Sequence, residues 1–147
     1  MKRLGIYFFF DKDGIVDKYV DYVLEDLTKH VDKLIVVCNG QLNERGRKTF
    51  EKFTGNIIVR ENKGFDVWAY KTAIDSEGWN KLIEYDEIIL MNYTIMGPVY
   101  PLEEMFDIMD KRLELDFWGI TKCFQENSPV AQQIWQCPYG YIPEHIQ

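Results

Sequence analysis

The sequence has few of the residues that build disulfide frameworks and metal sites. Its 147 residues include three cysteines and two histidines. The cysteines are odd in number and not closely paired, which is typical of a protein in a reducing compartment: Cys38, Cys123 and Cys137. Cys38 lies inside an apolar run, so we expect a buried thiol there. His30 and His145 are too few and too far apart for a zinc site.

Positive charge and long apolar runs are also scarce. The net charge is -7, and no basic cluster alternates with aromatic residues, which argues against a nucleic-acid partner. No apolar run approaches the length of a transmembrane helix. Residues 1–10 superficially resemble a signal peptide. Their apolar run is short, Asp11 ends it, and no small-residue cleavage site follows, so we expect a first strand instead.

Three common motifs of nucleotide and hydrolase sites are missing as well. No Gly-x-Gly-x-x-Gly follows the first apolar run, and no Gly-Lys-Ser/Thr loop occurs, which disfavours a dinucleotide site and a P-loop. No serine lies in a nucleophile-elbow setting, and Cys38 has no evident activating base.

Apolar and aromatic residues, in contrast, are plentiful. Hydrophobic residues make up 46% and aromatic residues 15% of a chain long enough for one domain with a sizeable core. The aromatic content predicts a packed core plus some exposed rings, of the kind that sugar and nucleobase sites use. The tryptophans themselves are expected in the core or at its margin rather than as sugar platforms: Trp68, Trp79, Trp118 and Trp135.

Short apolar runs alternate with amphipathic stretches, a pattern typical of an α/β fold with a mostly parallel open sheet. The runs predict five strands of one sheet: Leu4–Phe10, Leu34–Cys38, Ile57–Arg60, Asp86–Asn92 and Phe117–Thr121. The stretches between them predict helices on both faces: Asp17–His30, Asn43–Phe53, Val67–Ser76 and a helix that begins at Pro101 with an apolar stripe as far as Leu113.

Polar side chains follow the first four predicted strands. They are Asp11, Asn39, the stretch Asn62–Asp66, and Asn92 to Thr94. In an open α/β sheet these strand ends lie at the edge where ligands bind. Helix caps and turns need polar residues at the same places, so a structural interpretation stays open beside the functional one.

The segment Arg60–Asp66 is the densest of these groups. An amide, a glycine and a carboxylate occur within five residues, at Asn62, Gly64 and Asp66. Gly64 can take a positive φ or let a ligand approach the main chain. Asp66 can cap the following helix and still turn an oxygen toward a bound hydroxyl or amine. Asn-x-Gly is also a common turn, so structure and function are equally good interpretations of these residues alone.

Several motifs occur in order along nearly the whole chain: Arg60–Lys71 (RENKGFDVWAYK), Tyr85–Asn92 (YDEIILMN), Gly97-Pro98, Phe117–Thr121 (FWGIT) and His145–Gln147 (HIQ). Together they resemble the rhamnan synthesis protein F family, glycosyltransferase-like proteins of bacterial surface polysaccharide assembly. Separated motifs in the right sequence are far more specific than any one of them alone.

The resemblance implies a glycosyltransferase A-type fold and a nucleotide-diphospho-sugar donor. A sugar such as rhamnose would be transferred to a glycan or lipid-linked glycan acceptor by direct displacement at the anomeric carbon. Asp66 is a weak candidate for the base that deprotonates the acceptor hydroxyl. The implied donor-binding residues are Asp11, Asn39, Asn62, Gly64, Asp66, Asn92 and Thr94.

One position departs from the family pattern. The family usually has Asn-Asp-Ser after the fourth strand, whereas this chain has Asn92-Tyr93-Thr94. A divalent cation on a diphosphate prefers carboxylate oxygens, so we expect Mg²⁺ or Mn²⁺ to bind weakly. Either the metal is dispensable, another acid supplies the ligand, or this copy has lost activity.

The resemblance stops within a motif, at His145–Gln147. It implies that residues 1–147 are one α/β domain, the N-terminal donor-binding part of a longer glycosyltransferase domain. An unpaired sheet edge would then favour pairing between copies, as in a homodimer. The expected location is the cytoplasm, or the inner face of the membrane.

Two other interpretations remain open. One is a non-catalytic module of the same fold that binds a nucleotide sugar or a glycan and is inactive through truncation. The other is a receiver-like signalling domain with a flavodoxin-like fold, which Asp11, Asp13 and Lys122 mimic faintly. The signalling interpretation leaves the stretch Asn62–Asp66 unexplained.

Overall fold

A computed structural model describes residues 1–120 and shows an α/β fold built on one parallel sheet. The strand order is β3-β2-β1-β4, and every neighbouring pair is parallel. The strands are β1 (Arg3–Asp11), β2 (Lys33–Gly40), β3 (Ile57–Arg60) and β4 (Glu87–Asn92). The prediction of one mostly parallel sheet is therefore confirmed for the first four apolar runs.

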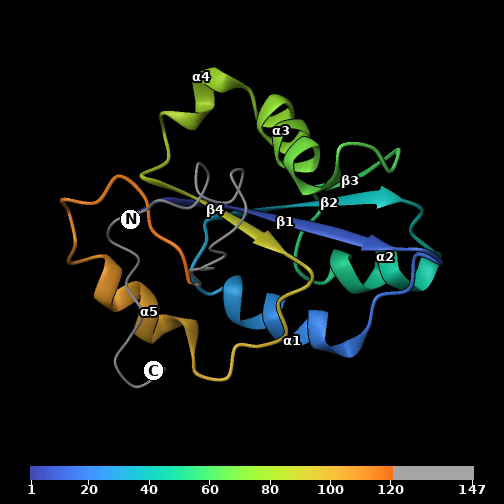
Figure 1. Cartoon of the computed structure of the whole chain (residues 1–147), viewed down its shortest axis with the longest axis horizontal. Coiled ribbons are helices and arrows are strands. Elements are labelled where there is room, and N and C mark those ends of the chain that lie inside the picture. Colours follow the sequence, from blue (N-terminus) through green and yellow to red (C-terminus); the bar gives the residue numbers. More distant parts are fainter. Residues whose placement is uncertain (121–147) are drawn as a thin grey trace, which may run out of the picture. The chain divides into compact units, whose positions relative to one another are not determined.

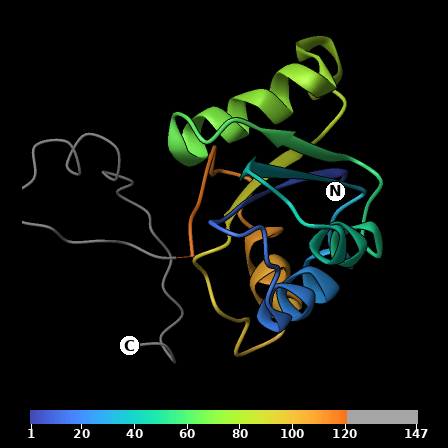
Figure 2. The ribbon, with the colours of Figure 1, turned by 90° about the vertical axis from the view of Figure 1, so that its right-hand side faces the viewer.

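Helices cover both faces of the sheet, as predicted (Figure 1). One face carries α3 (Phe65–Glu77) and α4 (Trp79–Leu82), and the other carries α1 (Lys18–Leu27) and α2 (Glu44–Glu51) (Figure 2). The helix α5 (Leu102–Met109) packs beside α1. There the Asp26 carboxylate accepts a hydrogen bond from the Leu102 N–H at 2.8 Å, and the rings of His30 and Phe106 lie 4.9 Å apart.

The strands β1 and β2 form the centre of the core because their apolar side chains are buried on both faces. On the opposite face from α3, the ring of Phe50 in α2 lies edge-on to Phe9, 5.3 Å away. On the α3 face, residues of both strands pack against two small residues of the helix: Leu4, Ile6, Phe8, Ile35 and Val37 against Ala69 and Ala73. Each buried aliphatic or aromatic side chain contributes about 1.5–3 kcal/mol.

The strand β4 is half exposed, although its sequence is a short apolar run like those of β1 and β2. Ile88 and Leu90 are 38% and 52% exposed, while their partners in register on β1, Leu4 and Ile6, are fully buried. The helix α3 packs on β1 and β2. Because β4 is an edge strand of the described sheet, α3 does not cover Ile88 and Leu90.

The start of α3 differs from the prediction. The helix begins at Phe65 rather than Val67, since the Trp68 N–H already donates to the Gly64 carbonyl at 3.1 Å. Gly64 and Phe65 both have a positive φ, of 73° and 52°. The predicted Asp66 cap is therefore wrong: Gly64 occupies the N-cap position and Asp66 lies in the first turn. An acidic residue in a first turn still favours the helix through its dipole.

The chain divides into two units, Met1–Ile108 and Met109–Gln147. The first contains the whole described sheet. In the second, residues 110–120 have no helix or strand and include turns, such as the one closed by the hydrogen bond from the Arg112 N–H to the Met109 carbonyl at 2.9 Å. The predicted apolar stripe therefore stops before Leu113, which is exposed.

The predicted fifth strand is wrong for Phe117–Ile120, where the structure has no strand, and Thr121 lies outside the described residues. A strand needs a partner for its backbone groups as well as an apolar composition, and no described strand pairs with this run. Within residues 1–120, no helix has both the length and the apolar character needed to cross a membrane.

Candidate functional site

The carboxyl ends of the four strands lie along one edge of the sheet. The register pairs Asp11 with Gly40, and Asn39 with both Phe10 and Arg60, while β4 ends at Asn92. The chain runs outward from β1 to β3 and then returns to β4 on the other side of β1. Open α/β sheets bind ligands at such a reversal of strand order.

Asn39 holds the segment that follows β3. Its side chain is fully buried, and its Nδ2 donates hydrogen bonds to the Phe65 carbonyl at 3.1 Å and the Asn62 Oδ1 at 3.4 Å. Its Oδ1 accepts a hydrogen bond from the Arg60 Nη1 at 2.7 Å. Both ends of the buried amide are satisfied, so this side chain fixes the loop rather than facing solvent.

Arg60 contributes a second tie to the same loop. While Nη1 bonds to Asn39, Nη2 donates to the Lys63 carbonyl at 2.9 Å. Sequence reasoning gave Arg60 no role in the site. The sequence did contain a signal for this role. A long cationic side chain directly before a tight polar turn can donate hydrogen bonds to carbonyl groups that the turn leaves unpaired.

Asp66 and Asn92 join the segments that follow the two outer strands. The Asn92 Nδ2 donates to the Asp66 Oδ2 at 3.1 Å, across 26 residues of sequence. The Asp66 Oδ1 accepts from the Val67 N–H at 2.9 Å, and the Asn92 Oδ1 accepts from the Thr94 N–H at 3.1 Å. Asp66 and Asn92 are half-buried and Thr94 is exposed. These side chains lie together only because the sheet brings β4 back beside β1.

Gly64 has the positive φ that its place in the turn predicts, and a second reason to be glycine. A Cβ at this position would lie 2.2 Å from ring atoms of Trp68. That ring lies at the surface, with the Lys63 ammonium 5.8 Å from its centroid. Trp68 and Trp79 are 49% and 66% exposed, which corrects the expectation that they lie in or beside the core. Trp135 lies outside the described residues.

Asp11 lies at the same edge of the sheet but within its own turn. Its Oδ1 accepts hydrogen bonds from the N–H groups of Asp13 at 2.9 Å and Ile15 at 2.8 Å. This carboxylate therefore closes the loop after β1.

Tyr93 is part of the packing at the end of β1. Its ring lies edge-on to Phe8 and Phe9, at 5.6 and 5.7 Å. Its N–H donates to the Phe8 carbonyl at 3.0 Å, and its carbonyl accepts from the Tyr19 hydroxyl at 2.8 Å. The residue that stands where the resemblance leads one to expect an aspartate thus fills space and supplies no carboxylate.

The residues at this edge fit a divalent cation poorly. Mg²⁺ and Mn²⁺ prefer several oxygen ligands, carboxylates above all. The carboxylates of Asp66 and Asp11 belong to two different turns, and the Tyr93 ring supplies no carboxylate. In residues 1–120 no group of three or more His, Cys, Asp or Glu side chains could hold a metal ion.

Two titratable groups near the site stay neutral. Cys38 is fully buried, which confirms the predicted buried thiol, and burial raises the pKa of this thiol to about 12. Burial also raises the pKa of Tyr70, and the Asp66 carboxylate adds to this rise. Neither side chain can therefore supply a thiolate or phenolate for nucleophilic chemistry at this edge.

The comparison with known families agrees with the motifs. The family model described as rhamnan synthesis protein F matches residues 34–147, from β2 onward. The matched region includes the segments that follow β3 and β4 and the residues that join them. No curated protein and no solved structure matches the chain.

Proposed function

The chain belongs to the rhamnan synthesis protein F family, and from this membership we propose that the carboxyl edge of its sheet binds a nucleotide-diphospho-sugar. The domain would have a glycosyltransferase A-type fold and act in rhamnan-type cell-surface polysaccharide synthesis. It would deliver a sugar such as rhamnose to a glycan or lipid-linked glycan acceptor. The proposed ligand-contacting residues are Asn62, Asp66, Asn92 and Thr94.

The hydrogen bond between Asp66 and Asn92 carries this proposal. It sets a carboxylate and an amide side by side at the point where the strand order reverses. A sugar presents hydroxyl groups that both donate and accept hydrogen bonds, and this pair offers both kinds of partner. The exposed amide of Asn62 and hydroxyl of Thr94 extend the same polar edge.

Asn39 and Gly64 are proposed to act through the loop rather than by touching the ligand. The buried Asn39 amide fixes the backbone at Phe65. Gly64 allows the left-handed turn that places Asp66 in the first turn of α3. Asp11 would lie near the nucleotide, at the end of the longest strand.

The proposed reaction is a direct displacement. The acceptor hydroxyl oxygen would form a bond to the anomeric carbon while its proton passes to a base, and the nucleoside diphosphate would leave with the electron pair of the broken bond. Asp66 is the proposed base. Both its oxygens accept hydrogen bonds from the protein, which fixes their direction, and each retains a lone pair for a ligand hydroxyl.

A non-catalytic module that binds the same donor is the second candidate. Tyr93 favours it, since its ring packs against Phe8 and Phe9 and the position next to Asn92 therefore has no carboxylate. In either case the domain would work on the cytoplasmic side, at the inner face of the membrane when the acceptor is lipid-linked.

Calorimetric titration with a panel of nucleotide-diphospho-sugars tests the proposal. We expect at least one to bind, and Asp66→Asn to weaken that binding about tenfold by replacing an ionised acceptor with a neutral one. The stability loss should stay near or below ~1 kcal/mol, the usual range for a first-turn or cap residue. Asp75→Asn is the matched control, since it makes the same change on the exposed part of the same helix.

Two outcomes would change the conclusion. If Asp66→Asn lowers the melting temperature but leaves the nucleotide-sugar affinity unchanged, Asp66 has a purely structural role. Donor binding without transfer to any acceptor would favour the non-catalytic module.

A further inference from the structure

Phe65 combines a strained backbone with an exposed ring. Its φ of 52° is the only positive value for a non-glycine residue in residues 1–120, and its side chain is 82% exposed. A bulky residue rarely adopts this conformation without a surrounding structure that imposes it. Here the buried amide of Asn39 holds the Phe65 carbonyl at 3.1 Å. A buried side chain thus fixes the backbone of a residue whose ring faces water.

Trp68 lies one helical turn later and is also at the surface. Its ring lies over Gly64, and the Lys63 ammonium lies 5.8 Å from the ring centroid. We call Phe65 and Trp68 the aromatic patch. Exposed aromatic rings on a rigid support are a common means of molecular recognition, since they offer a large contact area with little loss of conformational freedom.

The aromatic patch lies in the same short segment as part of the polar edge described above. Asn62 and Asp66 belong to the same seven residues of sequence as both rings. Apolar rings beside an amide and a carboxylate match the two kinds of surface on a sugar, whose C–H face packs on an aromatic ring while its hydroxyls bond to polar groups. A 6-deoxy sugar such as rhamnose has a methyl group in place of a hydroxymethyl group, which enlarges its apolar part.

We propose that the aromatic patch binds sugar rings of an uncharged glycan, the acceptor chain, beside the nucleotide-sugar site. This inference rests on the proposed function. The net charge of -7 favours an uncharged ligand at the aromatic patch over direct contact of the patch with anionic lipid. Membership of a family for rhamnan synthesis makes a glycan the appropriate ligand for a patch of this chemistry.

Titration of the whole 147-residue chain with a rhamnose oligosaccharide tests the inference, followed by calorimetry and tryptophan fluorescence. Phe65→Asn is the informative variant, because asparagine accepts a left-handed backbone and the loop should keep its shape. We expect it to weaken oligosaccharide binding about tenfold and to leave nucleotide-sugar binding within about twofold. Phe65→Trp should retain the oligosaccharide affinity. Trp79→Ala, which removes the exposed tryptophan on α4, should change neither affinity.

Four results would overturn the inference. The wild-type chain could fail to bind the oligosaccharide at millimolar concentration, or Phe65→Asn could bind it as well as the wild type. Equal loss of both affinities in Phe65→Asn would make the aromatic patch part of the donor site. Phe65-dependent binding to vesicles of phosphatidylcholine and phosphatidylglycerol, without glycan binding, would assign it to the membrane. A wild-type chain that binds the oligosaccharide but no nucleotide sugar would instead contradict the proposed function alone.

Discussion

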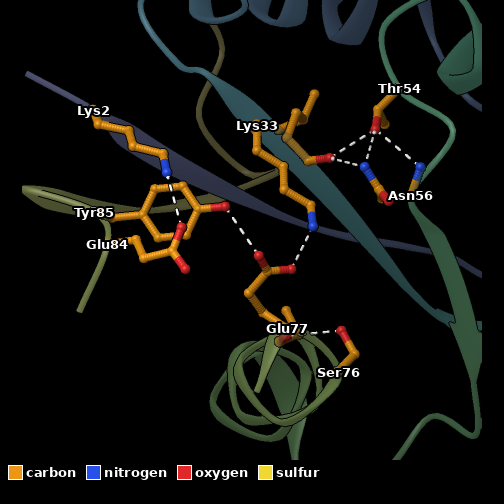
Figure 3. A network of polar contacts seen from close by, with 10 residues as sticks. Lys2, Lys33, Thr54, Asn56, Ser76, Glu77, Glu84 and Tyr85 are labelled. Atoms are coloured by element: carbon orange, nitrogen blue, oxygen red, sulfur yellow. Dashed lines mark hydrogen bonds and ion pairs between the residues drawn. The ribbon is translucent and has the colours of Figure 1, made fainter. Parts of the chain in front are cut away.

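The two edges of the sheet use polar residues in opposite ways. At the amino edge, the buried carboxylate of Glu77 lies between the Lys33 ammonium and the Tyr85 hydroxyl, which donates to it at 3.0 Å (Figure 3). At the carboxyl edge, Asn62 and Thr94 are exposed. Charges at the amino edge therefore neutralise each other inside the protein, whereas the carboxyl edge presents hydrogen-bonding groups to solvent.

Other carboxylates at the amino edge tie the starts of the strands together. The N–H groups of Lys2 and Arg3 donate to Asp86 at 2.6 Å and to Asp32 at 2.7 Å. The Arg3 Nε donates to Glu87 at 2.6 Å. These bonds join the beginning of β1 to residues at the starts of β2 and β4. The difference is that these amino-edge groups bond to one another and hold the strands together, whereas the carboxyl edge also has polar side chains, Asn62 and Thr94, that face solvent.

The largest effect should come from removing the centre of the amino edge. Glu77→Ala leaves Lys33 and Tyr85 without their shared acceptor, and breaking a buried pair in this way lowers the free energy of unfolding by about 3 kcal/mol. Nucleotide-sugar affinity should not change. Urea denaturation measures the first quantity and calorimetry the second. A loss of ligand affinity as large as the loss of stability would remove the distinction between the two edges.

The Glu77 carboxylate should also make the free energy of unfolding depend on pH in the acid range. The hydrogen bond from Lys33 holds the pKa of Glu77 below its ordinary value of 4.5. The unfolded chain therefore binds this proton more readily than the folded one, so the stabilisation is present above pH 4.5 and is lost as the pH falls through the folded pKa. We expect Glu77→Gln to make the unfolding free energy less dependent on pH below 4.5 than it is in the wild type. Parallel pH profiles of the two proteins would contradict this.

A smaller effect is expected from Gly64→Ala at the carboxyl edge, about 2 kcal/mol. The left-handed backbone costs roughly 1–2 kcal/mol with a side chain, and the Trp68 ring must also move. Gly78→Ala is the control for ligand binding, because Gly78 also has a positive φ but lies at the other end of α3. Thermal unfolding measures the loss of stability in Gly64→Ala. Unlike the control, Gly64→Ala should also weaken ligand binding.

Substitutions at Tyr93 test whether an added carboxylate creates a metal site at the carboxyl edge. Tyr93→Asp and Tyr93→Asn lose the same ring packing, but only the aspartate adds a carboxylate oxygen for Mn²⁺. We expect Tyr93→Asp to bind a nucleotide-diphospho-sugar about tenfold more tightly with Mn²⁺ than without it, and Tyr93→Asn to show no such gain. Tight Mn²⁺ binding by the wild-type chain without nucleotide would show that a metal site lies elsewhere.

The smallest effect should be at the surface of the amino edge. The ammonium of Lys2 pairs with the Glu84 carboxylate at 3.2 Å, and both side chains are largely exposed (Figure 3). Glu84→Ala should therefore lower the free energy of unfolding by at most about 0.5 kcal/mol, and less in high salt. A loss that approaches the one in Glu77→Ala would mean that burial does not decide the strength of the pairs at this edge.

The sequence by itself determined the local elements of this protein. The apolar runs predict β1 to β4, and the turn at Gly64 predicts its positive φ. The predicted second helix begins at Asn43, and the Asn43 Oδ1 caps α2 by accepting from the Gly46 N–H at 2.7 Å. Each of these features depends on residues a few positions apart, whose steric and hydrogen-bonding requirements are the same wherever the segment lies.

Only the tertiary structure decided which of those elements meet. Within residues 1–120 it placed β4 at an edge, which left Ile88 and Leu90 partly exposed, and it gave Phe117–Ile120 no strand to pair with. It also set Asp66 beside Asn92 and buried Asn39, whose amide holds the Phe65 carbonyl. These outcomes depend on the order of strands in the sheet. That order is set by the packing of segments far apart in the chain, which no local pattern of residues encodes.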